Sequence, residues 1–210
     1  MRCYQIISVI FLFSLMIGQN WDSRDRWQKA DEIIKAMNLM AGSSAADIGC
    51  KDGYLTIKLA KAVGEDGAVF AVDIDESALD DLQKNLDERK IANVRKVLGL
   101  VDNPKLNENS LDAAVILNAY HEMDDYPAML KHIKAALKKG GRLVIVDGIS
   151  NSRRKSSRKT QTNKHELAID LASNDLIEAG FRIIEKTEQF VSKHPWRDEQ
   201  WILVAVPASD

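Results

Sequence analysis

The chain has little of three things that would each narrow its class: cysteine, proline and net charge. Its 210 residues include 2 cysteines and 4 prolines, and 29 basic residues nearly balance 31 acidic ones, for a formal charge of −2. A nearly neutral chain gives no reason to expect a nucleic-acid partner, and few prolines and glycines argue against long disordered segments. Internal repeats are also missing, so we expect one globular domain.

An apolar run long enough to cross a membrane is missing as well. The N-terminus opens with Arg2 and is apolar from about Ile6 to Ile17, which is shorter than the roughly 20 residues of a spanning helix. A charge, a short apolar core and a small residue before a polar one describe a secretory signal peptide over residues 1–18. We therefore expect an exported protein, periplasmic or secreted, with residues 19–210 as one mature domain and no stable membrane span. A membrane-anchored or cytoplasmic protein is the alternative.

From residue 25 onward, helical and strand patterns alternate. Apolar residues at helical spacing predict helices over residues 25–39, 53–63, 76–90, 126–141 and 165–180. Short apolar runs predict strands over residues 44–49, 68–74, 93–99, 111–118 and 142–148. Two more runs, 181–191 and 201–207, have no helix between them and must pair antiparallel. The sequence thus predicts an α/β, Rossmann-like doubly wound sheet of seven strands: five parallel strands plus an antiparallel C-terminal hairpin, with helices on both faces.

Polar residues follow the strands of this sheet at the ends where ligands bind. The first strand leads to Asp47 and into the loop DIGCKDG, whose glycines let a ligand approach the backbone amides. The second strand ends at Asp73, 24 residues after Gly49, where an acidic side chain would accept hydrogen bonds from a ribose diol. The next three strands lead to Asp102, Asn118 and Asp147.

Four segments, in order, resemble the class I S-adenosylmethionine-dependent methyltransferases. ADIGCKDGYLT resembles their glycine-rich first motif, and VFAVDID the acidic end of their second strand. LDAAVILNAYHEMDDYPAMLKHIKAALKKGGRLVIVD resembles their fourth to fifth strands, and HELAIDLASNDLIEAGF with a strand pair their closing segment. The resemblance covers about Arg26 to Pro207. It implies S-adenosylmethionine as cofactor and methyl transfer to an unidentified small-molecule acceptor. A non-catalytic, degenerate cofactor-binding protein on this scaffold is the alternative.

The resemblance also implies roles for individual residues. Asp47 and Gly49 match positions that hold the methionine end of the cofactor, and Gly53 matches a glycine that packs the loop onto the following helix. Asp73 matches the carboxylate that takes the ribose hydroxyls, and Asp102 lies near the adenine contact. Asn118 and Ala119 match the segment beside the sulfonium and its methyl group. Cys50 and Ile74 complete the expected cofactor-binding set.

Lys51 is the departure from the first motif, since it replaces the middle glycine. We expect a tolerated substitution, because a lysine can point to solvent if its backbone angles are ordinary. The same residue breaks the Gly-x-Gly-x-x-Gly pattern of nicotinamide dehydrogenases. Taken singly, Asp47 and Asp73 could equally cap the helices that follow them. Cys50 is the one cysteine left after cleavage, so it forms no internal disulfide. We interpret it as a small, half-buried residue and not as a nucleophile, because methyl transfer from a sulfonium needs no covalent step.

A general base is needed only if the acceptor must lose a proton. His121 is the first candidate, followed by Asp147 and His165, although His121 with Glu122 could instead begin a helix facing water, and His165 could be a surface residue. The fourth residue after His121 is not histidine, so the zinc-protease pattern fails and we predict no metal site. We expect the basic segment 151–164 to be a mobile, solvated loop.

Overall fold

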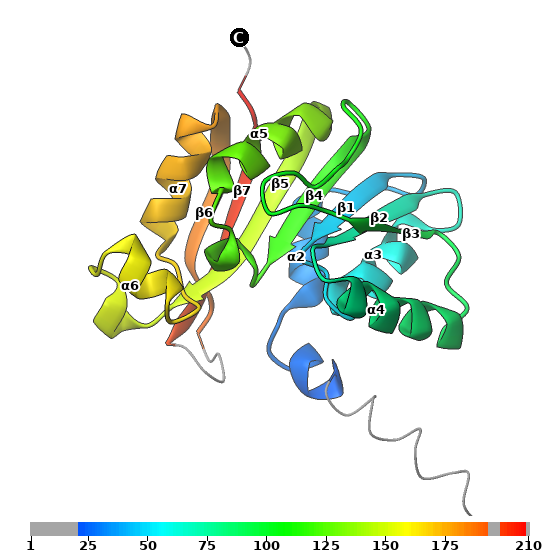
Figure 1. Cartoon of the computed structure of the whole chain (residues 1–210), viewed down its shortest axis with the longest axis horizontal. Helices are drawn as coiled ribbons and strands as arrows, with labels where there is room; N and C mark the ends of the chain where they lie inside the picture. The colour runs from blue at the N-terminus through cyan, green and yellow to red at the C-terminus, as the bar shows by residue number, and fades with distance from the viewer. Residues whose placement is uncertain (1–20, 193–197, 209–210) are drawn as a thin grey trace, which may run out of the picture.

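A seven-stranded sheet forms the centre of the computed structural model (Figure 1), which describes residues 21–192 and 198–208. The expected signal peptide lies outside the described residues. The strands are β1 (Ser44–Ile48), β2 (Ala68–Asp73), β3 (Val94–Leu98), β4 (Leu111–Leu117), β5 (Leu137–Ile149), β6 (Phe181–Val191) and β7 (Glu199–Pro207). Their order is β3-β2-β1-β4-β5-β7-β6, with β1 to β5 parallel and β7 antiparallel to both β5 and β6. The predicted sheet, including its hairpin, is confirmed.

Helices cover both faces of this sheet. They are α2 (Ala30–Met37), α3 (Tyr54–Val63), α4 (Glu76–Glu88), α5 (Tyr126–Ala136), α6 (Arg158–Thr162) and α7 (Ile169–Glu178). Successive side chains of a strand point to opposite faces, so Ala113 and Val115 of β4 pack with α2 and α3, whereas Ala114 and Ile116 pack with α5 and α7. This two-sided burial explains why β4 reads as one unbroken apolar run. Among the described helices, none is both long and apolar enough to cross a membrane.

Two predicted helix boundaries near the sheet are wrong. The N-terminal helix does not run from residue 25, because Lys29 has a φ of 52° and separates a helical turn at 21–25 from α2. The helix expected to end at the glycine pair 140–141 ends at Ala136. Leu137 is buried and pairs with Leu111 of β4, so β5 begins there and contains both glycines. Pairing with β4 and burial of Leu137 stabilise the strand here more than one further helical turn would.

The start of the last predicted helix is also wrong. His165 has a φ of 55° and lies in a turn, and α7 begins only at Ile169. The intervening backbone bonds to the rest of the domain: the Leu167 N–H donates to Gly148 O over 3.0 Å. The Leu167 carbonyl in turn accepts from Trp201 Nε1 over 2.7 Å.

The basic segment 151–164 is folded against the domain rather than solvated, which corrects the expectation for it. It contains the 3₁₀ turn η2 (Asn151–Arg153) and helix α6. Its arginines pair with acidic residues that lie outside the segment and are largely buried. The pairs are Arg153 with Glu166, Arg154 with Glu199, and Arg158 with Asp175. These ion pairs hold the segment and its helix α6 against the rest of the domain.

Candidate active site

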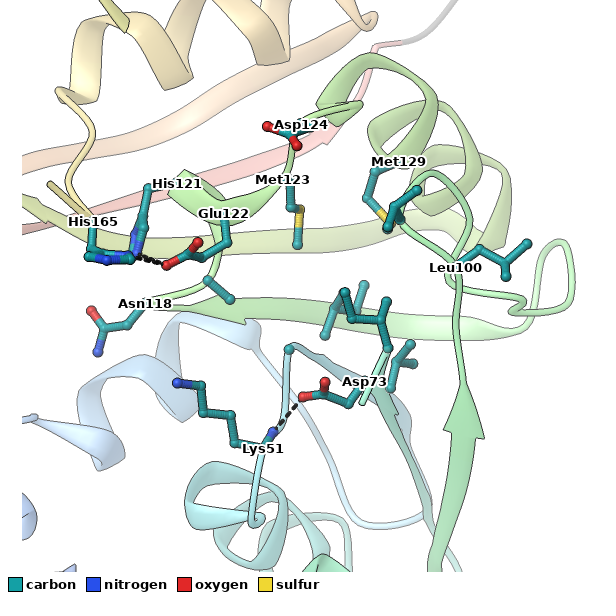
Figure 2. Close-up of a pocket in the computed structure, with 16 residues that line it drawn as sticks. Lys51, Asp73, Leu100, Asn118, His121, Glu122, Met123, Asp124, Met129 and His165 are labelled. Atoms are coloured by element: carbon teal, nitrogen blue, oxygen red, sulfur yellow. Dashed lines mark hydrogen bonds and ion pairs between the residues drawn. The ribbon is translucent and has the colours of Figure 1, made fainter. Parts of the chain in front are cut away.

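A cavity of about 580 Å³ opens at the carboxyl ends of β1, β2 and β4 (Figure 2). The strand order reverses between β1 and β4, which is where ligands bind in open α/β sheets. One wall comes from the loops after β1 and β2. The opposite wall comes from the segment after β4 and from the turn before α7. Most of the expected site residues lie on these walls.

Gly49 brings the loop after β1 directly against the segment after β4. Its φ is 78°, and a Cβ atom added there would lie 2.5 Å from Ala119 Cβ, closer than non-bonded carbons can approach. Gly53 also has a positive φ, of 90°, and a Cβ there would collide with Leu82 of α4. Gly53 is the N-cap of α3, and its lack of a side chain also lets the loop approach Leu82 of α4.

Lys51 does not have ordinary backbone angles, although its side chain is exposed. Its φ is 47°, in the left-handed region that favours glycine. In this conformation the Lys51 N–H donates to Asp73 Oδ2 over 2.8 Å (Figure 2). The side chain is exposed and lines the cavity. The loop therefore keeps the shape that a glycine would give, at the cost of some backbone strain.

Asp73 holds the loop after β1 and presents its carboxylate to the cavity. Besides the Lys51 N–H, it accepts from the Asp75 N–H over 3.1 Å. The residue that caps α4 is Asp75, whose Oδ1 accepts from the Ser77 N–H over 2.9 Å. The interpretation of Asp73 as a helix cap is therefore wrong.

Asp47 lies in a smaller cavity of about 200 Å³ beside the first one, together with Cys50. It is 2% exposed and accepts from Thr56 Oγ1 over 2.6 Å. Burial raises its pKa to about 6, although the Thr56 hydrogen bond and the Arg24 guanidinium oppose the rise. It does not cap α3, whose N-cap is Gly53. Burial, followed by the nearby Asp47 charge, also raises the pKa of the Cys50 thiol, which is therefore no nucleophile.

Three large apolar side chains are exposed on the cavity wall: Ile74, Leu100 and Val101. Ile74 was expected in the site, but Leu100 and Val101 were not. Asp102, expected near the adenine, is not among the lining residues, and its neighbour Val101 lines the cavity instead. Exposed apolar side chains that gather in one hollow are typical of a ligand surface.

His121 lies in the 3₁₀ turn η1 (Tyr120–Glu122) and is buried, so the interpretation that it faces water is wrong. Its Nδ1 lies 2.9 and 2.8 Å from the two carboxylate oxygens of Asp147. Asp147 is fully buried in β5 and also accepts from the backbone N–H groups of His121 and Gly148. This carboxylate fixes the orientation of the imidazole ring.

Glu122 and His165 complete a cluster with His121 (Figure 2). Glu122 Oε1 lies 3.2 Å from His121 Nε2 and 2.5 Å from His165 Nδ1. Partial burial would raise the pKa of Glu122, but the His165 hydrogen bond and the proximity of His121 lower it. The three candidates for proton transfer, His121, Asp147 and His165, are thus brought together, and Glu122 joins them although it was named beside His121 without being a candidate base.

Asn118 lies between the two cavities and belongs to a ring of three amides. Gln28 Nε2 donates to Gln200 Oε1 over 2.7 Å, Gln200 Nε2 to Asn118 Oδ1 over 2.7 Å, and Asn118 Nδ2 to Gln28 Oε1 over 3.2 Å. Both glutamines are fully buried. The ring ties the N-terminal segment and β7 to the end of β4. Neither glutamine was expected in the site.

Comparison with known proteins agrees with this geometry. The family described as "Methyltransferase domain" matches residues 45–141. The chain is thus similar to methyltransferases over this segment. Curated relatives include the demethylmenaquinone methyltransferases of Geobacillus sp. (strain WCH70), 30% identical over 122 residues, and of Staphylococcus saprophyticus, 31% identical over 128 residues. These matches cover 58% and 61% of this chain but 51% and 53% of the relatives, so the chain spans about half of their length.

Solved structures of this family share the fold over most of the chain. A methyltransferase from Aquifex aeolicus superposes with a TM-score of 0.75 at 22% identity, over 90% of this chain and 95% of that one. The geranyl diphosphate C-methyltransferase of Streptomyces coelicolor, solved with S-adenosyl-L-homocysteine, gives a TM-score of 0.70 at 15% identity, covering 87% and 79%.

The residues present fit the cofactor of this methyltransferase family. Gly49 lines both cavities without a side chain, and it is the glycine that lets the loop after β1 lie against Ala119. The Asp73 carboxylate stands at the rim of the larger cavity, and the buried Asp47 carboxylate in the smaller one. An acceptor for hydroxyls and an anionic group for an amine are thus both in place.

Proposed function

We propose that this protein is a methyltransferase that transfers the methyl group of S-adenosylmethionine to a small, largely apolar acceptor. The observation that carries the proposal is the placement of two chemistries on opposite walls of one cavity. Asp73 and the Gly49 loop stand on one side, and the Asp147-oriented His121 on the other. Residues 19–210 would form the single domain that does this.

The cofactor would lie along the ends of β1, β2 and β4. We assign its ribose hydroxyls to Asp73 and its methionine end to Asp47, with Gly49 leaving room between them. Ile74 and Val101 would pack on the base, so Val101 takes the place that the resemblance gave to Asp102. When bound, the cofactor supplies an electrophilic methyl group on a sulfonium, next to Asn118 and Ala119 in this arrangement.

His121 is the residue that would accept a proton from the acceptor. Because Nδ1 is committed to Asp147, Nε2 is the ring nitrogen that would take the proton, and Glu122 Oε1, 3.2 Å away, would stabilise the charge that results. Met123 and Met129 supply a soft apolar surface beside it. These features suit a hydroxylated aromatic ring, and the names of the curated relatives make a reduced quinone the acceptor class to test first.

Calorimetric titration of the full-length protein with S-adenosylmethionine tests the cofactor site. We expect binding that Asp73→Ala abolishes and that Asp66→Ala, a change of an exposed acid in another turn, leaves unchanged. Absence of binding in the wild-type protein would refute the proposal and support the degenerate scaffold. Titration with a nicotinamide dinucleotide in parallel should give no heat of binding.

Transfer of a labelled methyl group to a soluble reduced quinone tests the acceptor side. His121→Ala should lower kcat by about 10²- to 10⁴-fold, the usual contribution of a general base, with a smaller change in KM. His132→Ala removes an exposed histidine on α5 and should leave kcat unchanged. Full turnover by His121→Ala would remove His121 from the proposed mechanism.

Export by residues 1–18 is a further part of the proposal, resting on the sequence of that segment alone. An exported enzyme would need a supply of a cofactor that is made in the cytosol. Sequencing the N-terminus of the native protein tests this: a chain beginning at residue 19 supports export, and an intact Met1 in the cytosolic fraction contradicts it.

A further inference from the structure

His121, Glu122 and His165 form a compact group of potential metal ligands on the acceptor wall of the cavity. One ligand atom from each residue lies within 4.8 Å of the other two. We propose that these three side chains bind a divalent transition-metal cation, of which Zn²⁺ is the probe of choice. The role of this site in catalysis rests on the proposed methyltransferase function, whereas the binding of the ion does not.

The arrangement of the three ligand atoms supports a cation between them. Glu122 Oε1 is shared: it lies 3.2 Å from His121 Nε2 and 2.5 Å from His165 Nδ1. Because His121 Nδ1 donates to Asp147, a neutral His121 would turn the lone pair of Nε2 toward the Glu122 carboxylate. Two acceptors that face each other repel, and a metal ion bound between them would relieve this repulsion.

Asp147 gives the site the outer support that protein metal centres use. A histidine ligand normally donates its second ring N–H to a carboxylate or carbonyl, which fixes the ring and makes the other nitrogen a better ligand. His121 does this with a carboxylate that has no exposed surface and holds two backbone N–H groups besides. The imidazole is therefore already oriented for binding, without rearrangement of the buried core.

The backbone at His165 is consistent with a ligand role. Its φ of 55° is unusual for a residue other than glycine. This conformation directs the ring toward Glu122 and brings the His165 ring centroid within 5.9 Å of the His121 ring centroid (Figure 2). Strained backbone is commonly retained at ligand sites, where the surrounding structure enforces it.

Two imidazoles and one carboxylate favour a transition metal over Mg²⁺ or Ca²⁺, which prefer oxygen ligands alone. Three protein ligands also leave at least one position open, as catalytic zinc sites do. All three residues line the cavity, so an acceptor oxygen that coordinated the ion there would lose its proton more readily. The ion and a proton compete for His121 Nε2, so the loaded protein would activate the acceptor by coordination rather than through His121.

Titration of untagged, metal-free full-length protein with Co²⁺, followed by visible absorption, tests this site, with Zn²⁺ as the competitor. We expect one ion per chain and displacement of Co²⁺ by Zn²⁺. Glu122→Gln and His165→Ala change exposed side chains, so both variants should fold, and each should weaken Co²⁺ binding by more than ~10-fold, since even outer-sphere changes cost about that much. His132→Ala should bind as the wild type does.

Equal affinity in wild type, Glu122→Gln and His165→Ala would overturn the proposal, as would an equal loss in His132→Ala. Calorimetry with S-adenosyl-L-homocysteine separates this result from the fate of the cofactor site. Glu122→Gln and His165→Ala should keep their affinity for that ligand, whereas Asp73→Ala should lose it and still bind Co²⁺. Retained binding of S-adenosyl-L-homocysteine by Asp73→Ala would count against the cofactor assignment and not against the metal site.

Discussion

Replacing Asp47 by asparagine should stabilise the folded protein while weakening its binding of the cofactor. The Asp47 carboxyl has an ordinary pKa of 3.8, and burial raises it to about 6 in the folded protein. One pKa unit corresponds to 1.36 kcal/mol, so keeping this carboxylate ionised in the folded state costs about 3 kcal/mol at pH 8. The Thr56 hydrogen bond and the Arg24 charge are already included in that figure, and asparagine can still accept from Thr56.

The pH dependence gives the prediction its sign. As pH rises, the unfolded chain loses this proton first, near pH 4, and the folded protein only near pH 6. The contribution of Asp47 to the free energy of unfolding therefore falls between these values and stays low above them. Asp47→Asn should gain about 3 kcal/mol at pH 8 but less than about 1 kcal/mol near pH 4.

Urea unfolding at both pH values, with unchanged m, measures this difference. Asp66→Asn, at an exposed turn, is the matched control and should change little at either pH. The same Asp47→Asn variant should bind S-adenosyl-L-homocysteine at least ~10-fold more weakly, since a charged hydrogen bond is lost. A variant that is no more stable than wild type at pH 8, or that gains equally at both pH values, would refute the reasoning.

Three further changes test the packing around the site by denaturant unfolding. Lys51→Gly should raise the free energy of unfolding by up to about 1 kcal/mol, because relief of the left-handed conformation exceeds the entropy cost of glycine; a loss would mean that the side chain stabilises the loop. Gly49→Ala should cost at least about 2 kcal/mol and block cofactor binding, since its methyl group meets Ala119 Cβ; a neutral result would show that the loop yields. Gln200→Ala should lower the free energy of unfolding by about 1–3 kcal/mol, because it removes the hydrogen bond that the Asn118 amide oxygen accepts in the ring. One hydrogen bond contributes at least roughly 0.5 kcal/mol. A smaller loss would show that water replaces the ring.

Local sequence patterns predicted most of the strands and helices of the fold. The apolar runs and their helical neighbours located all seven strands within a few residues, because a strand buried on both faces must be apolar throughout. The same logic placed Asp47, Asp73, Asn118 and Asp147 at or just beyond strand ends, where parallel strands present their residues to one edge of the sheet. Each of these inferences needs only residues that are near one another in the chain.

Helix boundaries and backbone strain could not be foreseen in this way. Leu137 left its helix to pair with β4, and Lys51 took a left-handed conformation so that its amide could reach Asp73. In both positions the partner lies more than 20 residues away, so propensity alone gives the wrong answer.

What the sequence by itself determined is the sheet and the strand ends that line the cavity, because strands and helices repeat with a regular period. What only the tertiary structure decided is the wall formed by His121, Glu122 and His165. Glu122 meets His165 across 43 residues, and Gln28 meets Gln200 across 172. These contacts leave no periodic pattern in the sequence, because they depend on how the helices and strands that lie between the two residues pack together.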